Sequence, residues 1–526
     1  MPPPLYPLTT PQTLNRRTFL AGSASLALAT LTRGHAYGAV ARAPKFSAYP
    51  FSLGVASGDP APDGFVLWTR LAPQPLLGDG GMAPEAVEVS WQVCEDEAMT
   101  KIAAKGTAVA TPEWGHSVHV EVEGLRPDRW YWYQFKAGSE TSPTGRSRTF
   151  PAADAIPERL RFAFASCQHY ETGLYTAYEH MLAEAPDLVI HLGDYIYEYA
   201  GIENRVRKHV GPEITTLHDY RVRLAQYKSD PALQAMHAAA PWLVTWDDHE
   251  FDNNCAGDIS EEPGVSREDY LKRRAASYQA YYENMPLRRA ALPKGPDMLL
   301  YRRVPCGRLA DFHVLDTRQY RTDQPCGDGN KPPCPESLSP DATLLGHTQR
   351  DWLFENLAKS PAQWNVLAQQ VMMARVDRAA GPEVTHSMDQ WPGYEMERRR
   401  VLKYLHEQKI KNPVVLTGDI HSNWANNLIA DFDDLDSRVV ATEFVGTSIS
   451  SGGDGVLKPK TLAETYAQNP FVKFHSTERG YVSCEITPKL WHTKYQGVEY
   501  VSKPGAPLRT RASFVVEAGN PRLQKA

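Results

Sequence analysis

The stretch that decides the fold reads LVIHLGDYIYE and occupies residues 188–198. Two further stretches have the same form, LVTWDDHE at residues 243–250 and VVLTGDIH at residues 414–421. Each is a short apolar run, typical of a buried strand, that ends in polar side chains. In an open α/β sheet, chemistry gathers at the carboxyl ends of the strands. The three stretches therefore predict an α/β domain whose polar strand ends meet at one edge.

Six strand-like runs in this chain end in polar side chains. Those side chains are Ser166 and Cys167, Asp194 and Tyr197, Asp247 to His249, Asp316 and Arg318, Gln369 and Gln370, and Asp419 and His421. A single aspartate after a strand is usually a turn residue, and Asp316 with Arg318 could be such a turn with a local ion pair. Several carboxylates at one edge repel one another unless a multivalent cation lies among them. The pattern therefore predicts a cluster of two or more metal ions.

The types of side chain indicate which ions would bind. Aspartate and asparagine oxygens favour hard cations such as Ca²⁺. A thiolate at Cys167 and a phenolate at Tyr197 favour a trivalent, strongly Lewis-acidic ion, above all Fe³⁺. A tyrosine has a pKa of about 10, so it ligates as phenolate only beside a strong cation. Taken alone, each of these two residues would more often be a packed residue of the core than a metal ligand.

The first 41 residues have the form of an export signal. Arg16 and Arg17 precede a weak apolar run over residues 21–31, and small residues follow over residues 36–41. This pattern is typical of a twin-arginine signal peptide, and the apolar run is too short to span a bilayer. We therefore expect the twin-arginine export machinery as a partner, a periplasmic or secreted location, and no stable membrane span.

Length and composition bound the rest of the chain. At 526 residues the chain is too long for one hydrophobic core, so we expect at least two domains. The net charge of −6 argues against nucleic acid as the main partner, because such a partner favours a basic face. Residues 45–150 contain short runs of β-branched and aromatic residues between turn residues, which predicts an N-terminal β-sandwich domain. Within it, the run LRPDRWY at residues 125–131 resembles the tyrosine corner of fibronectin-type sandwiches.

A linker rich in proline and alanine covers residues 151–157, and an α/β domain is expected over residues 158–515. Helices are predicted over residues 173–184, 267–284 and 395–408, and strands over residues 187–192, 309–315 and 364–370. Gly211, the pair Asp230-Pro231 and the proline-rich stretch near Cys326 are expected to mark loops.

Seven cysteines are present, so at least one is unpaired if disulfides form. Cys326 and Cys334 flank a loop rich in Gly, Pro, Asp and Asn, and they are the best disulfide candidates in an oxidising compartment. The alternative is that both are free thiols. Cys167 is the expected unpaired cysteine, because its thiolate would ligate a metal ion.

The motifs together resemble a known family. The runs GDYIYEY (193–199), WDDHE (246–250), LDTRQYR (315–321) and LTGDIH (416–421) are similar to those of the PhoD family of alkaline phosphatases and phosphodiesterases, which is related to the purple acid phosphatases. The run FSLGVASGDP (51–60) resembles the N-terminal domain of that family. The resemblance implies a layered α/β metallophosphoesterase sandwich (αββα) preceded by an all-β fibronectin- or Ig-like domain.

The same resemblance implies a cluster of one Fe³⁺ and two Ca²⁺ ions, with Asp194 bridging from the iron to a calcium. Cys167, Asp194 and Tyr197 would hold the iron, and Asp248 or its neighbour Asp247, Asn254, Asp419 and His421 would complete the cluster. His249 would orient the leaving oxygen or donate a proton to it, and Arg318 would steady the phosphate or a ligand.

These features predict an exported, metal-dependent hydrolase of phosphate mono- and diesters, whose substrate is a small or polymeric phosphate ester. Phospholipase D-like cleavage of phospholipid head groups is the main alternative. An iron redox protein that uses Cys167 and Tyr197, and a non-catalytic binding protein built around the β-domain, are more remote alternatives.

Overall fold

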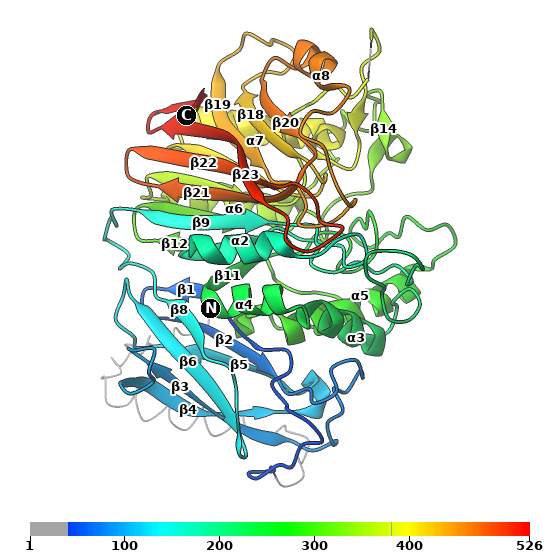
Figure 1. The fold of residues 1–526 in the computed structure, drawn as a ribbon. Coiled ribbons are helices and arrows are strands. Elements are labelled where there is room, and N and C mark those ends of the chain that lie inside the picture. Colours follow the sequence, from blue (N-terminus) through cyan, green and yellow to red (C-terminus); the bar gives the residue numbers. More distant parts are fainter. Residues whose placement is uncertain (1–39, 380) are drawn as a thin grey trace, which may run out of the picture.

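A computed structural model describes residues 40–379 and 381–526 of the chain (Figure 1). Nearly all of the predicted signal peptide, residues 1–39, lies outside the described residues, so the export signal stays a prediction. Within the described ranges, no helix combines the length and the apolar character that crossing a bilayer requires.

A ten-stranded sheet runs through the molecule. Its order is β24 (Asn520–Lys525), β23 (Leu508–Glu517), β22 (Leu490–Val498), β21 (Arg479–Ile486), β9 (Leu160–Ala165), β10 (Leu188–His191), β11 (Pro241–Val244), β1 (Val55–Ala61), β2 (Gly64–Arg70) and β5 (Ser117–Val122). The central strands β9, β10 and β11 are parallel, with His191 of β10 opposite Ala165 of β9 and Val244 of β11. The polar residues that follow these strands therefore emerge at one edge of the sheet.

A second sheet has seven strands. Its order is β12 (Arg302–Cys306), β13 (Ala310–Val314), β15 (Trp364–Ala368), β17 (Pro413–Thr417), β19 (Val439–Val445), β18 (Asn423–Ile429) and β20 (Val472–Ser476). Here β13, β15 and β17 are parallel, with Ala368 of β15 opposite Val314 of β13 and Leu416 of β17. The two sheets thus have the same arrangement of parallel central strands.

Alternation of side chains along the strands places the two sheets face to face. Phe162 and Phe164 of β9 belong to the same buried cluster as Phe312 of β13 and Phe444 of β19. The ring centroids of Phe162 and Phe312 lie 5.6 Å apart. The neighbouring Ala163 of β9 points to the other face of its sheet, where it packs with residues of the helices.

Helices cover the outer face of each sheet. The ten-stranded sheet packs against α2 (Thr176–Glu184), α3 (Leu217–Lys228), α4 (Pro231–Ala239) and α5 (Arg267–Asn284). The seven-stranded sheet packs against α6 (Gly346–Lys359) and α7 (Glu395–Glu407), while the short α8 (Leu462–Gln468) lies beside β20.

The N-terminal strands are continuous with the main sheet, because β1 pairs in parallel with β11 through Ser57↔Pro241 and Gly58↔Trp242. A separate five-stranded sheet packs onto β1, β2 and β5 and lies at the lower end of Figure 1. It contains β3 (Val87–Cys94), β4 (Ile102–Ala110), β6 (Trp130–Ala137), β7 (Glu140–Thr141) and β8 (Gly145–Arg148). The predicted tyrosine corner is confirmed, because the Tyr131 hydroxyl donates to the carbonyl of Arg126 at 3.2 Å and accepts from its N–H at 2.9 Å.

Most predicted elements agree with the structure. The helix over 267–284 is confirmed, and the helix over 395–408 ends one residue earlier. The helix predicted from residue 173 begins at Thr176, because the N–H of Leu174 donates to the carbonyl of Val501 instead of taking part in a helical turn.

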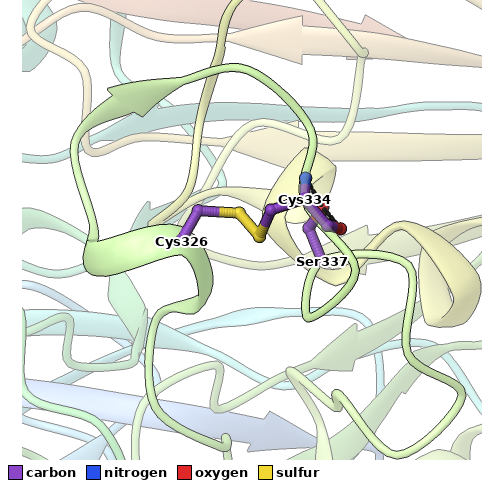
Figure 2. The surroundings of a disulfide bond; sticks show 3 residues. All are labelled: Cys326, Cys334 and Ser337. Carbon is purple, nitrogen blue, oxygen red and sulfur yellow. Dashed lines mark hydrogen bonds between the residues drawn. A yellow bond between two sulfur atoms is a disulfide. The ribbon is translucent and has the colours of Figure 1, made fainter.

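Cys326 and Cys334 form the predicted disulfide, with their Cα atoms 5.9 Å apart (Figure 2). The Ser337 hydroxyl accepts from the N–H of Cys334 at 3.1 Å and donates to its carbonyl at 2.9 Å, which fixes one end of the loop. The other five cysteines are free and buried, and Cys167 is among them as expected.

Candidate metal centre

The carboxyl ends of the parallel strands from both sheets meet at one place. The hydroxyl of Thr245, which follows β11, donates to the carbonyl of Leu315, which follows β13, at 3.0 Å. The Gln370 amide, which follows β15, donates to Thr245 Oγ1 and to Leu315 O, both at 2.9 Å. Gln370 therefore joins the two sheets at this edge, as a structural residue.

Cys167, Asp194 and His421 come from three different strand ends, and their ligand atoms lie within 4.8 Å of one another. The Tyr197 hydroxyl donates to Asp194 Oδ2 at 2.9 Å and lies 3.0 Å from His421 Nε2. The Ser451 hydroxyl in turn donates to the Tyr197 oxygen at 2.8 Å. The structure thus brings together a thiol, a carboxylate, a phenol and an imidazole, all of them predicted site residues.

A second group of acids adjoins the first. The carboxylates of Asp247, Asp248 and Asp419 have oxygens within 4.8 Å of one another, and Asp248 forms a further such group with Asp194 and His249. Because Asp194 and Asp248 each belong to two groups, the sets overlap and form one continuous cluster. The arrangement has room for more than one cation in a row.

Arg318 lies among these acids and is 1% exposed. Its Nη1 donates to Asp389 at 2.8 Å, its Nε pairs with Asp247, and its Nη2 lies 3.5 Å from Asp248 and 3.8 Å from Asp419. A guanidinium enclosed in this way holds the carboxylates in position. Two roles were expected for Arg318, contact with the phosphate or support of a metal ligand, and this geometry fits support of the ligands better.

Three buried carboxylate oxygens in the cluster have no hydrogen-bond partner among the described residues. They are Asp194 Oδ1, Asp247 Oδ2 and Asp248 Oδ1. Buried carboxylate oxygens normally have a partner, since leaving one unpaired costs about 1–3 kcal/mol or more. A bound cation would supply the missing partner, so the side chains present fit a metal cluster.

The electrostatics of the site point the same way. Burial raises the pKa of Asp194 and of Asp247 well above the usual range, and it raises the pKa of Asp419 to about 6. Burial likewise raises the pKa of the Cys167 thiol and the Tyr197 phenol. Metal ligands must be deprotonated, so cations that bind here would displace protons from these groups.

His249 differs from the other histidines of the site. Burial alone would lower its pKa, but the carboxylates of Glu198, Asp248 and Asp194 raise it well above its usual value. Its Nδ1 lies 2.8 Å from Glu198 Oε2, which fixes the orientation of the ring. Glu198 and the neighbouring aspartates therefore favour the protonated form of His249 at the edge of the acid cluster.

Five of the predicted site residues adopt left-handed backbone conformations that are unusual for residues other than glycine. Their φ angles are 58° at Cys167, 55° at Asp194, 47° at Asn254, 65° at Asp419 and 51° at His421. Such conformations persist only where the surroundings enforce them, and they concentrate at functional sites.

Two predicted site residues lie less centrally. Asn254 donates through its backbone N–H to Asp248 Oδ2 and through Nδ2 to Asp328 Oδ2, both at 2.7 Å, so it connects the cluster to the disulfide loop. Asp316 accepts from the N–H groups of Arg318 at 3.0 Å and Gln319 at 2.9 Å, which is the turn-residue role that we left open for it.

Sequence reasoning gave no role to several residues that hold the site. The Glu250 carboxylate accepts the N–H groups of Asp194 at 3.0 Å, of Asp247 at 2.8 Å and of Tyr195. Asp389 pairs with both Arg318 and Arg321, and it follows only the two-residue strand β16 (His386–Ser387), which is too short to signal its position in the sequence. The position of Glu250 beside two candidate ligands in WDDHE was the signal that could have identified it.

A cavity of about 460 Å³ opens beside the cluster. His421 and Arg479 line it on the side of the cluster, and Arg378, Trp424 and His475 are among the other residues of the wall. Among the described residues that line this cavity, His421 is the only predicted ligand.

Comparisons with known proteins agree along the chain. The family model described as PhoD-like phosphatase matches residues 162–495, and the model described as PhoD-like phosphatase, N-terminal domain, matches residues 38–151. Alkaline phosphatase D of Bacillus subtilis (strain 168) is 52% identical over 522 residues, which covers 98% of this chain and 89% of that protein. A solved structure described as "Structure of PhoD" is similar with a TM-score of 0.90 and 53% identity, over 92% of this chain and 93% of that one.

Proposed function

The chain belongs to the PhoD-like phosphatase family and is a phosphoric ester hydrolase, and from this premise we propose that it cleaves phosphate mono- and diesters at a centre of one Fe³⁺ and two Ca²⁺ ions. The observation that carries the proposal is the set of buried carboxylate oxygens on Asp194, Asp247 and Asp248 that accept no hydrogen bond from the described residues. Family membership favours hydrolysis over the redox and binding-protein alternatives.

Different side chains suit the different ions. Cys167, Asp194 and Tyr197 would hold the iron, since a thiol and a phenol lie together only on this side of the described cluster. Asp248, Asn254, Asp419 and His421 would complete the cluster, with Asp247 as the alternative to Asp248. When bound, the ions would supply positive charge that offsets the charge of the phosphoryl oxygens.

The side chains of the protein would perform the remaining steps. The imidazolium of His249, held by Glu198, would donate a proton to the leaving oxygen of the ester. Arg318 would keep Asp247, Asp389 and their neighbours at fixed separations. Burial of these groups limits the screening of their charges by bulk solvent. The water consumed in the hydrolysis would bond to phosphorus as the bond to the leaving oxygen breaks, and that oxygen would take the proton from His249.

The finer description of fold and location is part of the same proposal. Residues 158–515 would form an αββα metallophosphoesterase domain, and residues 45–150 a fibronectin- or Ig-like domain. Export through the twin-arginine machinery to a periplasmic or secreted location would suit the disulfide between Cys326 and Cys334.

Elemental analysis of the purified, exported protein tests the metal centre. We expect one iron and two calcium atoms per chain, and we expect calcium chelation to stop hydrolysis of a chromogenic phosphodiester. The variant Asp194→Ala should lose metal and at least a thousandfold in turnover, because its carboxylate joins both parts of the cluster.

The exposed acid Asp436 provides the control, since Asp436→Ala removes the same charge far from any cluster. A colourless, iron-free and calcium-free protein with full activity would overturn the proposal.

A further inference from the structure

The cavity beside the metal centre contains a guanidinium with no carboxylate partner. Arg378 lines the cavity, is half-buried, and forms no ion pair with any described carboxylate. Its guanidinium lies over the Trp424 ring at 5.4 Å from the centroid. Its one side-chain hydrogen bond among the described residues goes to Gln390 Oε1 and is long, at 3.4 Å.

The other charged groups of the cavity wall are already engaged or lie at the rim. Arg479 donates to the carbonyls of Gly453 and His421, so it supports backbone. Asp377 accepts the N–H groups of Ala379 and Thr385, both at 3.0 Å. Glu464 is exposed. Neither Arg378 nor Arg479 has a carboxylate within ion-pair distance among the described residues, but only Arg378 is left with most of its N–H groups free to bind a ligand.

The position of Arg378 indicates which part of a substrate it would meet. Gln390 separates it from the metal centre, because the Gln390 amide donates to Asp419 Oδ2 at 2.9 Å while its oxygen accepts from Arg378. A phosphoryl group held at the acid cluster would therefore lie on the far side of Gln390. The group that reaches Arg378 would be a substituent of the ester, not the phosphoryl group itself.

We propose that Arg378 is a specificity-determining residue that binds a second anionic group, carried on the ester substituent of a phosphodiester substrate. A guanidinium forms charge-assisted, bidentate hydrogen bonds with phosphate, and the Trp424 ring holds it in place without neutralising it. The substrate class is a phosphodiester with a further phosphate on the retained alcohol. The inference rests on the proposed phosphodiester chemistry of the neighbouring centre.

Two matched substrates test this inference on the full-length, metal-loaded protein. Thymidine 5′-(4-nitrophenyl phosphate) and its 3′-phosphorylated form release the same chromophore and differ only in the second phosphate. We expect Arg378→Gln to lower kcat/KM about tenfold for the 3′-phosphorylated substrate, chiefly through KM, and to change it less than twofold for the other. Arg378→Lys should recover part of the loss, because it keeps the charge.

The exposed arginine Arg438 supplies a control, since Arg438→Gln removes one positive charge away from the cavity and should leave both substrates unaffected. An equal loss for both substrates in Arg378→Gln would overturn the inference and assign Arg378 to the support of Asp419. No change for either substrate would also overturn it. If the unmodified protein cleaves neither substrate, the proposed phosphodiester activity fails first, and this inference fails with it.

Discussion

At the scale of single residues, the candidate metal centre is under conformational strain that one buried acid offsets. Asp194 has a left-handed backbone, and an L-residue in that region costs about 1–2 kcal/mol. The Glu250 carboxylate accepts N–H groups from the loop that follows β10 and from the loop that follows β11. Glu250 therefore holds two strand ends in the positions that their ligands require.

The variant Glu250→Gln tests this role. Three N–H groups point at the two oxygens of Glu250, so an amide would place an NH₂ group against at least one of them. A buried N–H left without an acceptor costs about 1–3 kcal/mol, and we expect a loss of that size in the free energy of unfolding. Metal content should fall as well, because Asp194 and Asp247 lose their fixed orientation.

Urea unfolding and elemental analysis of the variant provide the measurement, and Glu158→Gln at an exposed position outside every candidate metal group is the matched control. An unchanged unfolding midpoint together with full metal content would show that Glu250 is not the residue that fixes these loops.

Several candidate ligands could be predicted from the sequence because they stand just beyond a strand, whereas Asn254 lies well beyond β11 and was expected only from the family resemblance. Asp194 and Asp419 stand two residues or fewer beyond apolar runs, so the local pattern sufficed. The supporting residues were harder, because their partners are remote: Glu250 bonds to Asp194 across 56 residues, and Asp389 to Arg318 across 71. No local pattern contains such a pairing.

At the scale of elements, capping signals do not separate the predicted helices from the missed ones, because α2 and α7 were predicted without a side-chain N-cap. α5 begins where the Ser266 hydroxyl accepts the N–H of Asp269 at 3.1 Å, a typical N-cap. α3 and α4 were missed although they have caps of the same kind. The pair Asp230-Pro231, expected to mark a loop, starts α4: the Asp230 carboxylate accepts the N–H of Ala232 at 2.9 Å, and Pro231 occupies the first turn.

The strands β21 to β24 were also missed. They are antiparallel neighbours, and β21 pairs with β9, which lies more than 300 residues earlier in the chain. A half-buried strand depends on its partners for stability more than on its own residues. The pairing that fixes these strands was therefore not visible in the sequence.

The loop closed by the Cys326–Cys334 disulfide is predicted to support calcium binding. Between Cys326 and Cys334, Asp328 accepts from Asn254, and the strand β14 (Asn330–Lys331) pairs with β16 (His386–Ser387). Replacing both cysteines by serine removes a loop constraint of roughly 2–3 kcal/mol. We expect activity to need several-fold more calcium, because Asn254 loses a fixed neighbour, while iron content stays unchanged.

Calcium titration of the hydrolysis rate measures the effect. A reductant should shift the unmodified protein toward the behaviour of the double variant and leave the double variant itself unaffected. If the unmodified protein and the double variant need the same calcium concentration with and without reductant, the disulfide loop has no influence on calcium binding at the metal centre.

At the scale of the whole molecule, buried neutral histidines determine how stability responds to acid. Burial lowers the pKa of His191 to about 3 and the pKa of His313 to about 4, and the ring nitrogens of both are buried without described partners. The pKa of His475 is likewise lowered by burial, to about 4. In the unfolded chain a histidine titrates near a pKa of about 6.5.

Between about pH 4 and 6.5 each of these histidines binds a proton in the unfolded chain but not in the folded one, so each makes the free energy of unfolding fall as the pH falls through this window. We expect urea midpoints to decrease from pH 7 to pH 4, and His313→Leu to reduce the slope by about one proton. The exposed histidine variant His406→Leu should leave the slope unchanged. A slope that His313→Leu does not alter would contradict the assignment of this residue.

The continuity of the ten-stranded sheet bears on how such a protein can change over evolution or by engineering. Because β1 forms a ladder with β11, the division between an N-terminal and a catalytic part passes through hydrogen bonds and not through a flexible joint. A recombination event that exchanged only the first 150 residues would leave β11 with an open backbone edge, a surface that invites aggregation. The two parts would therefore have to be exchanged together. We expect folded protein from chimaeras in which β1 and β11 come from the same parent.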